Sequence, residues 1–482
     1  MKFTTLLFVL VAAVLCVSAV HSREQVPVQA PEAPTGFDNQ SNGFSDPERR
    51  QADQKFFNEI EGLAPDGLGP LYNAQSCREC HQTPDSGAAS QVAELRVGHL
   101  DAHGLFLNPQ IPINHGTEVI RDRTLVNDRA ICPEVQERVP DTETIRTFRL
   151  TTNILGDGYV EAIPDETLLK IRRQQCKSTH RKICGQAVKV PVPEVEGKDR
   201  IGRFGWKDQH ASLLAFAADA YLNEMGITSR LQKAEVTTTC NPPVAATVPN
   251  QDPSKVTEPN SLPDPGDNNL EDIDHFASFM RSLKAPGRDE TAAATADVKH
   301  GAEVFSRIGC AICHVATIVT GKSPAIAAGP GLHPEAVENR TIHPYSDFLL
   351  HDVGTGDGIS VALIEHFGRE RVEKRLREER SVEGKESATI NEEECSESYQ
   401  DAVAEGEKNP KLLRDTLCAR NKIRTAPLWG LRLRSRLMHD GLSVQVEDAI
   451  RRHAGESQKV TKEFLKLKSA DQKAVLAFLQ SL

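Results

Sequence analysis

Cys77-Arg78-Glu79-Cys80-His81 and Cys310-Ala311-Ile312-Cys313-His314 are the stretches of sequence that decide how this chain is interpreted. Both have the pattern C-x-x-C-H, in which two thiols attach a c-type haem and the adjacent histidine ligates the iron. A split zinc site or a redox-active dithiol would not require a histidine at the same position in both copies. The sequence therefore predicts two covalently bound haems, attached through Cys77, Cys80, Cys310 and Cys313, with His81 and His314 as proximal ligands.

The surroundings of the two motifs also repeat. Residues 296–305 (ADVKHGAEVF), just before the second motif, place Val298 and Phe305 on one face of a predicted helix. Residues 276–283 (FASFMRSL) and 474–482 (AVLAFLQSL) predict two closing helices that both end in Ser-Leu. A helix before the haem motif and a helix that closes the module are typical of a cytochrome c core. The sequence therefore predicts a mainly α fold with two cytochrome c-like domains, each with one haem site and long loop insertions.

These repeats divide the chain into two predicted domains. The domain of the first motif (haem 1) spans residues 43–284, a Pro- and Gly-containing linker spans 285–294, and the domain of the second motif (haem 2) spans 295–482. Both exceed a minimal cytochrome. We assign the extra length to a loop over residues 240–268 and to a charged insertion over residues 369–422.

The N-terminal residues have the features of a secretory signal peptide. Lys2 supplies a positive charge, and residues 6–15 form an apolar run that is too short to span a bilayer. We expect residues 1–22 to be removed, which leaves a flexible segment over residues 23–42 and no transmembrane anchor. The sequence therefore predicts a periplasmic or otherwise exported protein, in agreement with the attachment of c-type haem outside the cytoplasm.

The composition excludes one class of function and accounts for the cysteines. The 482 residues carry a formal net charge of −11, which argues against nucleic-acid binding because such binding requires a basic face. Aromatic residues make up only 5% of the chain, as expected if two porphyrins fill part of the core. Of the 11 cysteines, one lies in the signal peptide and four lie in the haem motifs, which leaves six for disulfides. We favour the pairs Cys176–Cys184 and Cys395–Cys418, while the partners of Cys132 and Cys240 stay open.

The sixth ligands of the two irons decide between an electron carrier and an enzyme. A haem with two protein ligands passes electrons, whereas a haem with an open position also binds peroxide or dioxygen. The chain has only four methionines, of which Met1 belongs to the signal peptide. Met280 lies on a helix that we expect to pack in the core. Histidines therefore have to supply more of the ligands.

Further motifs resemble one family. Residues 424–431 (RTAPLWGL), followed by 437–441 (LMHDG), are similar to the signature of the bacterial di-haem cytochrome c peroxidase superfamily. Other motifs resemble the di-haem oxidoreductase and peroxidase family within it, which is often labelled thiol oxidoreductase. These motifs are residues 67–73 (GLGPLYN), 202–207 (GRFGWK), 223–228 (NEMGIT) and 349–354 (LLHDVG). The resemblance covers most of residues 43–482, with 369–422 as the main departure.

The resemblance implies further site residues. In this family the distal ligand of the second haem follows the histidine of the H-D-G turn by about fourteen residues, and this offset leads to His453. On the distal side of haem 1, Trp206 and Tyr221 occupy positions where relatives carry aromatic residues. Glu224 and Glu161 are the candidate acid–base groups, because peroxide cleavage requires a group that moves a proton between its oxygens.

Other histidines and a metal ion complete the candidates. His439 is expected to orient the turn between the haems rather than to bind iron. The candidate sixth ligands of haem 1 among the histidines are His99, His103, His115 and His210. Relatives hold a calcium ion between the domains, so the resemblance also implies calcium, although the sequence has no diagnostic oxygen-ligand motif for it.

These features predict an exported di-haem oxidoreductase whose haem 1 has an exchangeable sixth position. The resemblance implies reduction of hydrogen peroxide, with electrons relayed through haem 2 from a small donor protein, either a cytochrome c or a cupredoxin. One alternative is an oxygenase or protein-modifying oxidase of the same family, acting with dioxygen or peroxide. The other is a pure electron-transfer cytochrome, which follows if both irons have two protein ligands.

Overall fold

A computed structural model of the chain describes residues 30–63, 66–100, 106–114, 116, 118–121, 123–237, 239–240, 269–323, 329–360 and 419–482. Several sequence predictions lie outside these residues, namely the signal peptide 1–22, residues 23–29, residues 241–268 of the predicted loop, the Cys395–Cys418 disulfide, His103, His115 and residues 369–418 of the insertion. None of the helices in the described ranges is both long enough and apolar enough to cross a membrane.

Two pairs of helices accompany the two haem motifs. α1 (Pro47–Asn58) packs against α6 (Asp272–Ser282), and α8 (Ala296–Ile308) packs against α16 (Ser469–Ser481). The helix that the sequence predicts ahead of the second motif is therefore present as α8. The two predicted closing helices are present as α6 and α16.

The ends and the crossing point of α8 show why its sequence forms this pair. Thr295 caps the first turn, because its side chain accepts a hydrogen bond from the Val298 amide. The helix ends at Gly309, whose φ of +104° lies in the left-handed region that favours glycine. At the crossing with α16, a Cβ on Gly301 would lie 1.9 Å from the carbonyl oxygen of Ala474. Glycine at this position therefore allows the two backbones to approach closely.

The prediction of a mainly α fold is wrong, because the chain also forms several small sheets. Of the residues that the structure describes, 34% are helical and 17% are in strands. The largest sheet has β2 (Ala93–Leu100) in contact with β8 (Ile145–Leu150), β6 (Leu125–Val126) and β3 (Phe106–Leu107), and all these pairs are antiparallel. This sheet lies in the part of the chain that the sequence analysis assigned to a helical haem domain.

The local sequence of β2 explains why this segment is a strand. Glu94 and Arg96 alternate with Leu95 and Val97, and a period of two is typical of a half-buried strand. In the register with β8, Glu94 lies opposite Arg149. Opposite charges at such cross-strand positions stabilise the pairing.

The other sheets have two strands each. The pairs are β1 (Leu71–Tyr72) with β7 (Arg129–Ala130), β4 (Gln110–Pro112) with β5 (Val119–Arg121), β9 (Lys189–Pro191) with β10 (Asp199–Ile201), β11 (Ile318–Val319) with β12 (Thr341–Ile342), and β13 (Leu350–His351) with β14 (Ile423–Arg424). Strands of two or three residues give little sequence signal.

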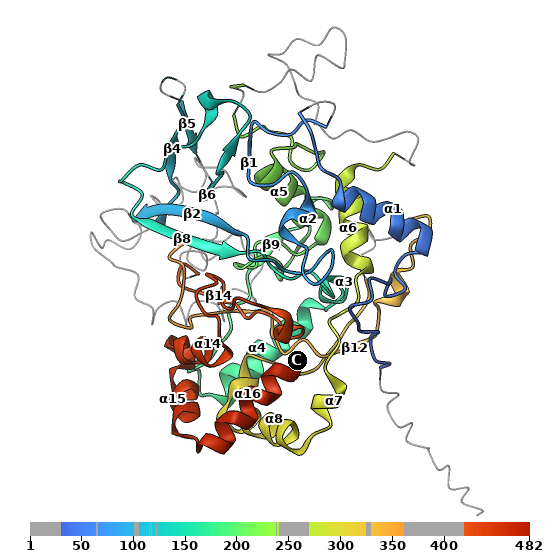
Figure 1. Cartoon of the computed structure of the whole chain (residues 1–482), viewed down its shortest axis with the longest axis vertical. Coiled ribbons are helices and arrows are strands. Elements are labelled where there is room, and N and C mark those ends of the chain that lie inside the picture. Colours follow the sequence, from blue (N-terminus) through green and yellow to red (C-terminus); the bar gives the residue numbers. More distant parts are fainter. Residues whose placement is uncertain are drawn as a thin grey trace, which may run out of the picture.

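The remaining helical elements are short, apart from α4 and α5. They are α2 (Cys77–Cys80), α3 (Asp157–Glu161), α4 (Asp165–Ser178), α5 (Leu213–Met225), α7 (Glu290–Ala293), α14 (Val446–Arg452), α15 (Gln458–Lys466) and the 3₁₀ turns η1 (Pro133–Val135), η5 (Cys310–Ile312), η7 (Pro334–Ala336), η8 (Leu431–Leu433) and η9 (Gly455–Ser457). In Figure 1, β1 to β8 lie at one end of the molecule with α1, α2, α5 and α6, and α8 and α14 to α16 lie at the other end.

Contacts cross the boundary that the sequence analysis placed at residues 285–294. α4 belongs to the first predicted domain but lies among the C-terminal helices in Figure 1. Its Gln175 donates a hydrogen bond from Nε2 to the carbonyl oxygen of Ile312, at 2.8 Å, inside the second haem motif. Residues on both sides of the predicted boundary therefore build the surroundings of haem 2.

Two disulfides join residues of the described chain. Cys176 pairs with Cys184, as the sequence analysis favoured, and Cys132 pairs with Cys240, a pairing that it left open. The free cysteines in the described ranges are Cys77, Cys80, Cys310 and Cys313, the four that belong to the haem motifs. The chain therefore separates its structural cysteines from those predicted to attach haem.

Candidate haem sites

The first haem motif forms a short helix that fixes the orientation of its histidine. α2 begins at Ser76, whose hydroxyl oxygen accepts a hydrogen bond of 3.2 Å from the Glu79 amide. His81 follows α2 directly, and its Nδ1 lies 3.2 Å from the carbonyl oxygen of Ala88. With Nδ1–H as the donor, Nε2 keeps the lone pair that an iron ligand requires. Burial lowers the pKa of His81 to about 4, so the imidazole is neutral.

A cavity beside His81, called the first cavity below, is lined by the motif and by α5. Its lining residues are Phe57, Ala74, Ser76, Cys77, Cys80, His81, Ile154, Phe216, Ala217, Ala220, Tyr221, Glu224, Met225, Phe276 and Met280. Both thiols and the histidine of the motif therefore face one mostly apolar space. Ala217 and Ala220 are small, so α5 leaves room on its side of this space. The donor set fits a haem with one histidine ligand.

Tyr221 and Glu224, two of the predicted distal residues, line the first cavity. The Tyr221 hydroxyl donates a hydrogen bond of 2.8 Å to Oδ2 of Asp272, and Oε1 of Glu61 lies 3.4 Å away. Burial, together with the Asp272 charge, raises the pKa of Glu61 to about 8. The tyrosine hydroxyl is thus held by the half-buried carboxylate of Asp272.

The surroundings of Glu224 favour its protonated form. Asn73 donates a hydrogen bond from Nδ2 to Oε2 of Glu224, at 2.7 Å. Burial raises the pKa of Glu224 well above its usual range, and the charge and hydrogen bond of Glu94 raise it further. A protonated carboxyl group at the edge of a haem cavity is able to donate a proton to a bound ligand.

Glu161, the second candidate acid, does not line the first cavity. Its carboxylate accepts two hydrogen bonds from the Arg281 guanidinium, at 2.7 and 2.9 Å, and one from the Leu213 amide, at 2.8 Å. Burial opposes its ionisation, but Arg281 outweighs burial and holds the pKa of Glu161 below its usual value. The residue therefore joins α3, α5 and α6 as an ionised partner of Arg281.

The second haem motif lies at the end of α8, beside a cavity that is lined by four histidines, His314, His351, His439 and His453. The second cavity, as it is called below, is lined by Cys310, Cys313, His314 and His453, among others. Nδ1 of His314 lies 2.9 Å from the carbonyl oxygen of Tyr345, and Nδ1 of His453 lies 2.7 Å from that of Ala449. If each Nδ1–H donates, both Nε2 atoms are free for a metal. This arrangement fits a haem with two histidine ligands.

An arginine without a complete set of partners also lines the second cavity. Arg434 is half-buried, desolvation of its guanidinium lowers its pKa to about 10, and its Nη2 donates to the carbonyl oxygens of Pro427 and Trp429. Its Nε has no hydrogen-bond partner among the residues that the structure describes. A haem carries two propionate carboxylates, and a buried guanidinium is the group that binds such carboxylates best.

The comparison with protein families agrees with this geometry. A family model described as "Di-haem oxidoreductase, putative peroxidase" matches residues 122–376 and 401–482, which is more than half of the chain. The chain belongs to the di-haem oxidoreductase family. The match includes the second haem motif and begins after the first one, so Cys77–Cys80 and His81 lie outside it. Membership of this family implies haem cofactors and redox chemistry.

Comparisons with individual proteins are less informative. Hydrazine synthase of Kuenenia stuttgartiensis is similar over the whole of both chains, with 14% identity and a TM-score of 0.35. A MauG-like protein associated with microbial copper homeostasis is similar over 95% of both chains, with 12% identity and a TM-score of 0.34. No curated protein matches this di-haem oxidoreductase.

Trp206 of this di-haem oxidoreductase lines the second cavity rather than the first. Its Nε1 donates a hydrogen bond of 2.7 Å to the carbonyl oxygen of Leu150, and its ring centroid lies 6.2 Å from that of His439. His439 lines the same cavity, and burial lowers its pKa to about 4. The structure therefore brings Trp206 together with His314 and His453, and brings Tyr221 and Glu224 together with His81.

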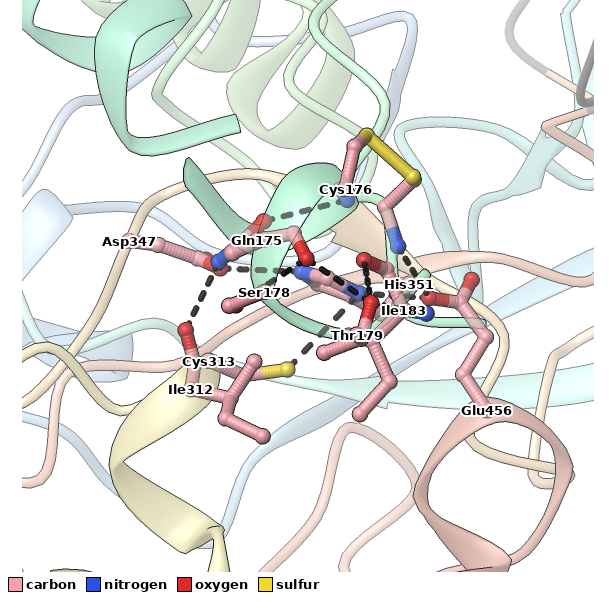
Figure 2. The surroundings of a disulfide bond; sticks show 12 residues. Gln175, Cys176, Ser178, Thr179, Ile183, Ile312, Cys313, Asp347, His351 and Glu456 are labelled. Atoms are coloured by element: carbon pink, nitrogen blue, oxygen red, sulfur yellow. Dashed lines mark hydrogen bonds and ion pairs between the residues drawn. A yellow bond between two sulfur atoms is a disulfide. The ribbon is translucent and has the colours of Figure 1, made fainter. Parts of the chain in front are cut away.

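A cluster that sequence reasoning did not single out lies against the second motif. Figure 2 shows His351 beside Cys313, Asp347 and Glu456, close to the Cys176 disulfide. His351 Nε2 lies 2.9 Å from Asp347 Oδ2, and its Nδ1 lies 3.0 Å from Glu456 Oε2 and 3.7 Å from the Cys313 sulfur. Burial would lower the pKa of His351, but Cys313 and Asp347 raise it well above its usual value. The motif LLHDVG contains this histidine, but its carboxylate partners are distant in sequence.

Neither of the other described histidine candidates lines the first cavity. His99 lies 2.8 Å from a Glu143 oxygen, and His210 lies 3.2 Å from an Asp219 oxygen. Within the described ranges, the groups of three or more residues with metal-ligand spacing are Cys132, Glu134, Cys240 and Cys313, Asp347, His351. Both groups contain cysteine, so neither has the set of oxygen ligands that calcium prefers.

Sequence reasoning also missed Glu94 and Asn73, which hold Glu224. Asn73 lies in the motif GLGPLYN, which indicates the family resemblance but does not predict a contact with Glu224. Glu94 lies on β2, where alternation of polar and apolar residues was the available signal. Alternation predicts a strand, but it does not predict which side chain the strand places beside a cavity.

Proposed function

We propose that this di-haem oxidoreductase is an exported enzyme that reduces hydrogen peroxide at haem 1, while haem 2 relays electrons to it. In this proposal Cys77 and Cys80 attach haem 1, and Cys310 and Cys313 attach haem 2, through thioether bonds. The observation that carries the proposal is the difference between the two cavities. The first has one histidine and a protonated carboxyl group, whereas the second has two histidines with free Nε2 atoms.

The number of histidines in each cavity indicates which haem reacts with peroxide and which haem transfers electrons. An iron held by His314 and His453 has no open position, so haem 2 exchanges electrons only. In the first cavity His81 is the only described histidine, and Ala217 and Ala220 leave space on the side of α5. Haem 1 therefore has room for peroxide.

Protons are the part of the reaction that this chain's side chains supply. Reduction of one hydrogen peroxide to two waters consumes two electrons and two protons. The bound haems supply the iron that binds peroxide and the electrons that cleave its O–O bond. Glu224 faces the same cavity, and its surroundings favour the protonated form, so it would donate a proton to the leaving oxygen. Asn73 orients the carboxyl group through its 2.7 Å hydrogen bond.

The electrons would come from a small donor protein, a cytochrome c or a cupredoxin, in the compartment that c-type haem attachment requires. The signal-peptide features of residues 1–22 and the two disulfides support an oxidising compartment outside the cytoplasm. Mass spectrometry of the mature protein tests export and covalent attachment together, since it reports the cleaved N-terminus and the added mass of two haems.

An electron-transfer cytochrome is the second candidate function, and two methionines favour it. Met225 and Met280 both line the first cavity. A thioether sulfur from either one would close the sixth position of haem 1. The test must therefore determine whether haem 1 is open.

Optical and electron paramagnetic resonance spectra of the holoprotein decide between the two functions. The proposal expects one high-spin signal that changes when peroxide is added to the oxidised or half-reduced protein, and one low-spin signal that does not. The variants M225L and M280L should leave the high-spin signal unchanged. Two low-spin signals that do not change when peroxide is added, in any redox state, would instead identify an electron carrier.

A further inference from the structure

We propose that Glu94 and Glu224 form a proton relay between solvent and the first cavity, with Glu94 as the solvent-side member. The relay deepens the proposed function and rests on it, because peroxide reduction at haem 1 consumes protons inside this cavity. In the site described above Glu94 only contacts Glu224, and no part in proton transfer was assigned to it.

The two carboxyl groups belong to different parts of the fold and face different surroundings. Glu224 lies in the last turn of α5 and lines the first cavity together with Cys80 and His81. Glu94 lies on β2, and its side chain is 20% exposed. A hydrogen bond between the two carboxyl groups joins them. The pair therefore has one end in the cavity and the other end accessible to water.

Each member of the pair has its own anchor. Arg96 donates two hydrogen bonds to Glu94, at 2.7 and 3.0 Å, so the Glu94 carboxylate is held in a bidentate ion pair. Asn73 donates to Glu224 Oε2 and to no oxygen of Glu94. Glu94 is therefore paired with a cation, whereas Glu224 is bound by a neutral amide, and this difference favours the proton on Glu224.

The charges around the pair distinguish its members. Burial opposes ionisation of Glu94, but Arg96 outweighs it, and Arg149 on β8 adds to the effect, so the pKa of Glu94 is lowered. Burial and the Glu94 charge raise the pKa of Glu224. Cys80 on α2 and, beside it, Glu79 are the other titratable groups in this region, and a thioether bond removes the charge of Cys80. These surroundings favour one shared proton in the pair, with Glu224 as its preferred site.

This arrangement gives a balanced cycle of proton transfer. Glu224 donates its proton to the oxygen that leaves as water and becomes a carboxylate. Glu94 then takes a proton from solvent water and passes it along the hydrogen bond to Glu224. Two such cycles supply the two protons that one peroxide consumes, and the pair returns to its starting state.

The substitution Glu94→Gln tests the relay with a readout that needs no peroxide. Difference infrared spectroscopy of the holoprotein follows the protonated carboxyl group of Glu224 as the pH rises, and Glu224→Gln identifies its band. Without the negative charge of Glu94, Glu224 should lose its proton at a pH at least about one unit lower. Peroxide turnover at neutral pH should fall about ten- to a hundredfold, because proton return is interrupted.

Two further variants control the experiment. Glu94→Asp keeps a carboxylate beside Glu224 and should restore much of the wild-type titration. Glu143→Gln changes a carboxylate in the same β-sheet region that contacts His99 and does not line the cavity, and it should leave the titration unchanged. If Glu94→Gln does not fold, Glu94→Asp alone tests the relay. In that variant Glu224 should lose its proton at a pH somewhat lower than in the wild type.

The relay and the proposed function fail in different ways. A wild-type protein that leaves peroxide unreduced contradicts the proposed function and leaves the relay without a reaction to serve. An active wild-type protein overturns the relay if neither Glu94 variant moves the titration of Glu224. It also overturns the relay if Glu94→Gln turns over at the wild-type rate.

Discussion

His351 Nδ1 lies 3.0 Å from Oε2 of Glu456, three residues after the predicted haem ligand His453. On the other side of the ring, Nε2 lies 2.9 Å from Asp347 Oδ2. Burial lowers the pKa of His351, whereas Cys313 and Asp347 raise it well above its usual value. A carboxylate oxygen at each ring nitrogen favours the protonated imidazole, also when Cys313 is bonded to haem. The second haem motif thus has a buried positive charge beside Cys313.

Replacing His351 with Gln should lower the midpoint potential of haem 2. The positive charge of His351 favours the reduced iron, and its loss favours the oxidised iron. A unit charge about 10 Å away changes the redox free energy by about 1.5 kcal/mol at an effective dielectric constant of about 20, or about 60 mV for one electron. Spectroelectrochemical titration measures both haems. His300→Gln, which changes an exposed histidine paired with Asp471, should leave both potentials unchanged. A shift confined to haem 1 would contradict this assignment.

The two glutamates predicted as acid–base candidates should behave differently on substitution. Glu161→Gln leaves Arg281 as an unpaired buried cation, so the free energy of unfolding should fall by about 3–5 kcal/mol. Peroxide turnover per folded molecule should stay near the wild-type value.

Glu224→Gln removes the proton donor of the first cavity, so turnover should fall about 10²- to 10⁴-fold with little loss of stability. Thermal unfolding measures the loss of stability, and stopped-flow kinetics measure the loss of turnover. A large loss of turnover in Glu161→Gln would show that Glu161, and not only Glu224, takes part in the reaction.

Acid should weaken the fold through Asp357. Burial opposes its ionisation, but Arg149 and Lys207, each 2.8 Å from a carboxylate oxygen, hold the pKa of Asp357 well below its usual range. The unfolded-state value is about 3.9, so these ion pairs contribute fully above about pH 5 and lose their contribution as the pH falls below 3.9.

Asp357→Asn should therefore lower the free energy of unfolding by about 3–5 kcal/mol at pH 7, because Arg149 and Lys207 lose their partner. The difference from the wild type should be smaller at pH 3. Denaturant unfolding at the two pH values measures it. Asp141→Asn, at a fully exposed carboxylate, should match the wild type at both. If the stability difference between Asp357→Asn and the wild type grows toward pH 3, the Asp357 ion pairs do not stabilise the fold in the way described.

Local signals account for what the sequence predicted. The C-x-x-C-H motifs, the helix that precedes Cys310 and the two closing helices depend on residues that are close in sequence, and the structure places helices there. Cys176 lies in the last turn of α4, and Cys184 follows eight residues later, just after the helix ends. These features require no knowledge of how distant segments meet.

The sheets and the side-chain partners depend on distant segments, and the sequence did not predict them. β2 pairs with β8 across about fifty residues, and most of the other strands have only two residues. Trp206 lies with His439 in the second cavity because β14 and the chain after it return to this region. Period-two alternation in β2 was visible, but Glu94 beside Glu224 follows only from the fold.

The ligand assignment of haem 2 depends on His453, and its substitution gives the sharpest spectroscopic prediction. The side chain follows α14 at its C-terminus, and Nδ1 lies 2.7 Å from the Ala449 carbonyl oxygen, so Nε2 faces the second cavity as a neutral donor. Burial lowers the pKa of His453, which keeps the imidazole neutral near pH 7.

His453→Gly should convert the low-spin signal of haem 2 to a high-spin signal and leave the haem 1 signal unchanged, because the iron keeps His314 and loses its sixth ligand. Added imidazole should restore the low-spin signal, since it can occupy the space that the side chain vacates. His333→Gln, at an exposed histidine that contacts Asp46, should leave both signals unchanged. If haem 2 stays low-spin in His453→Gly without imidazole, another residue is its sixth ligand, and the second cavity no longer explains why haem 2 only transfers electrons.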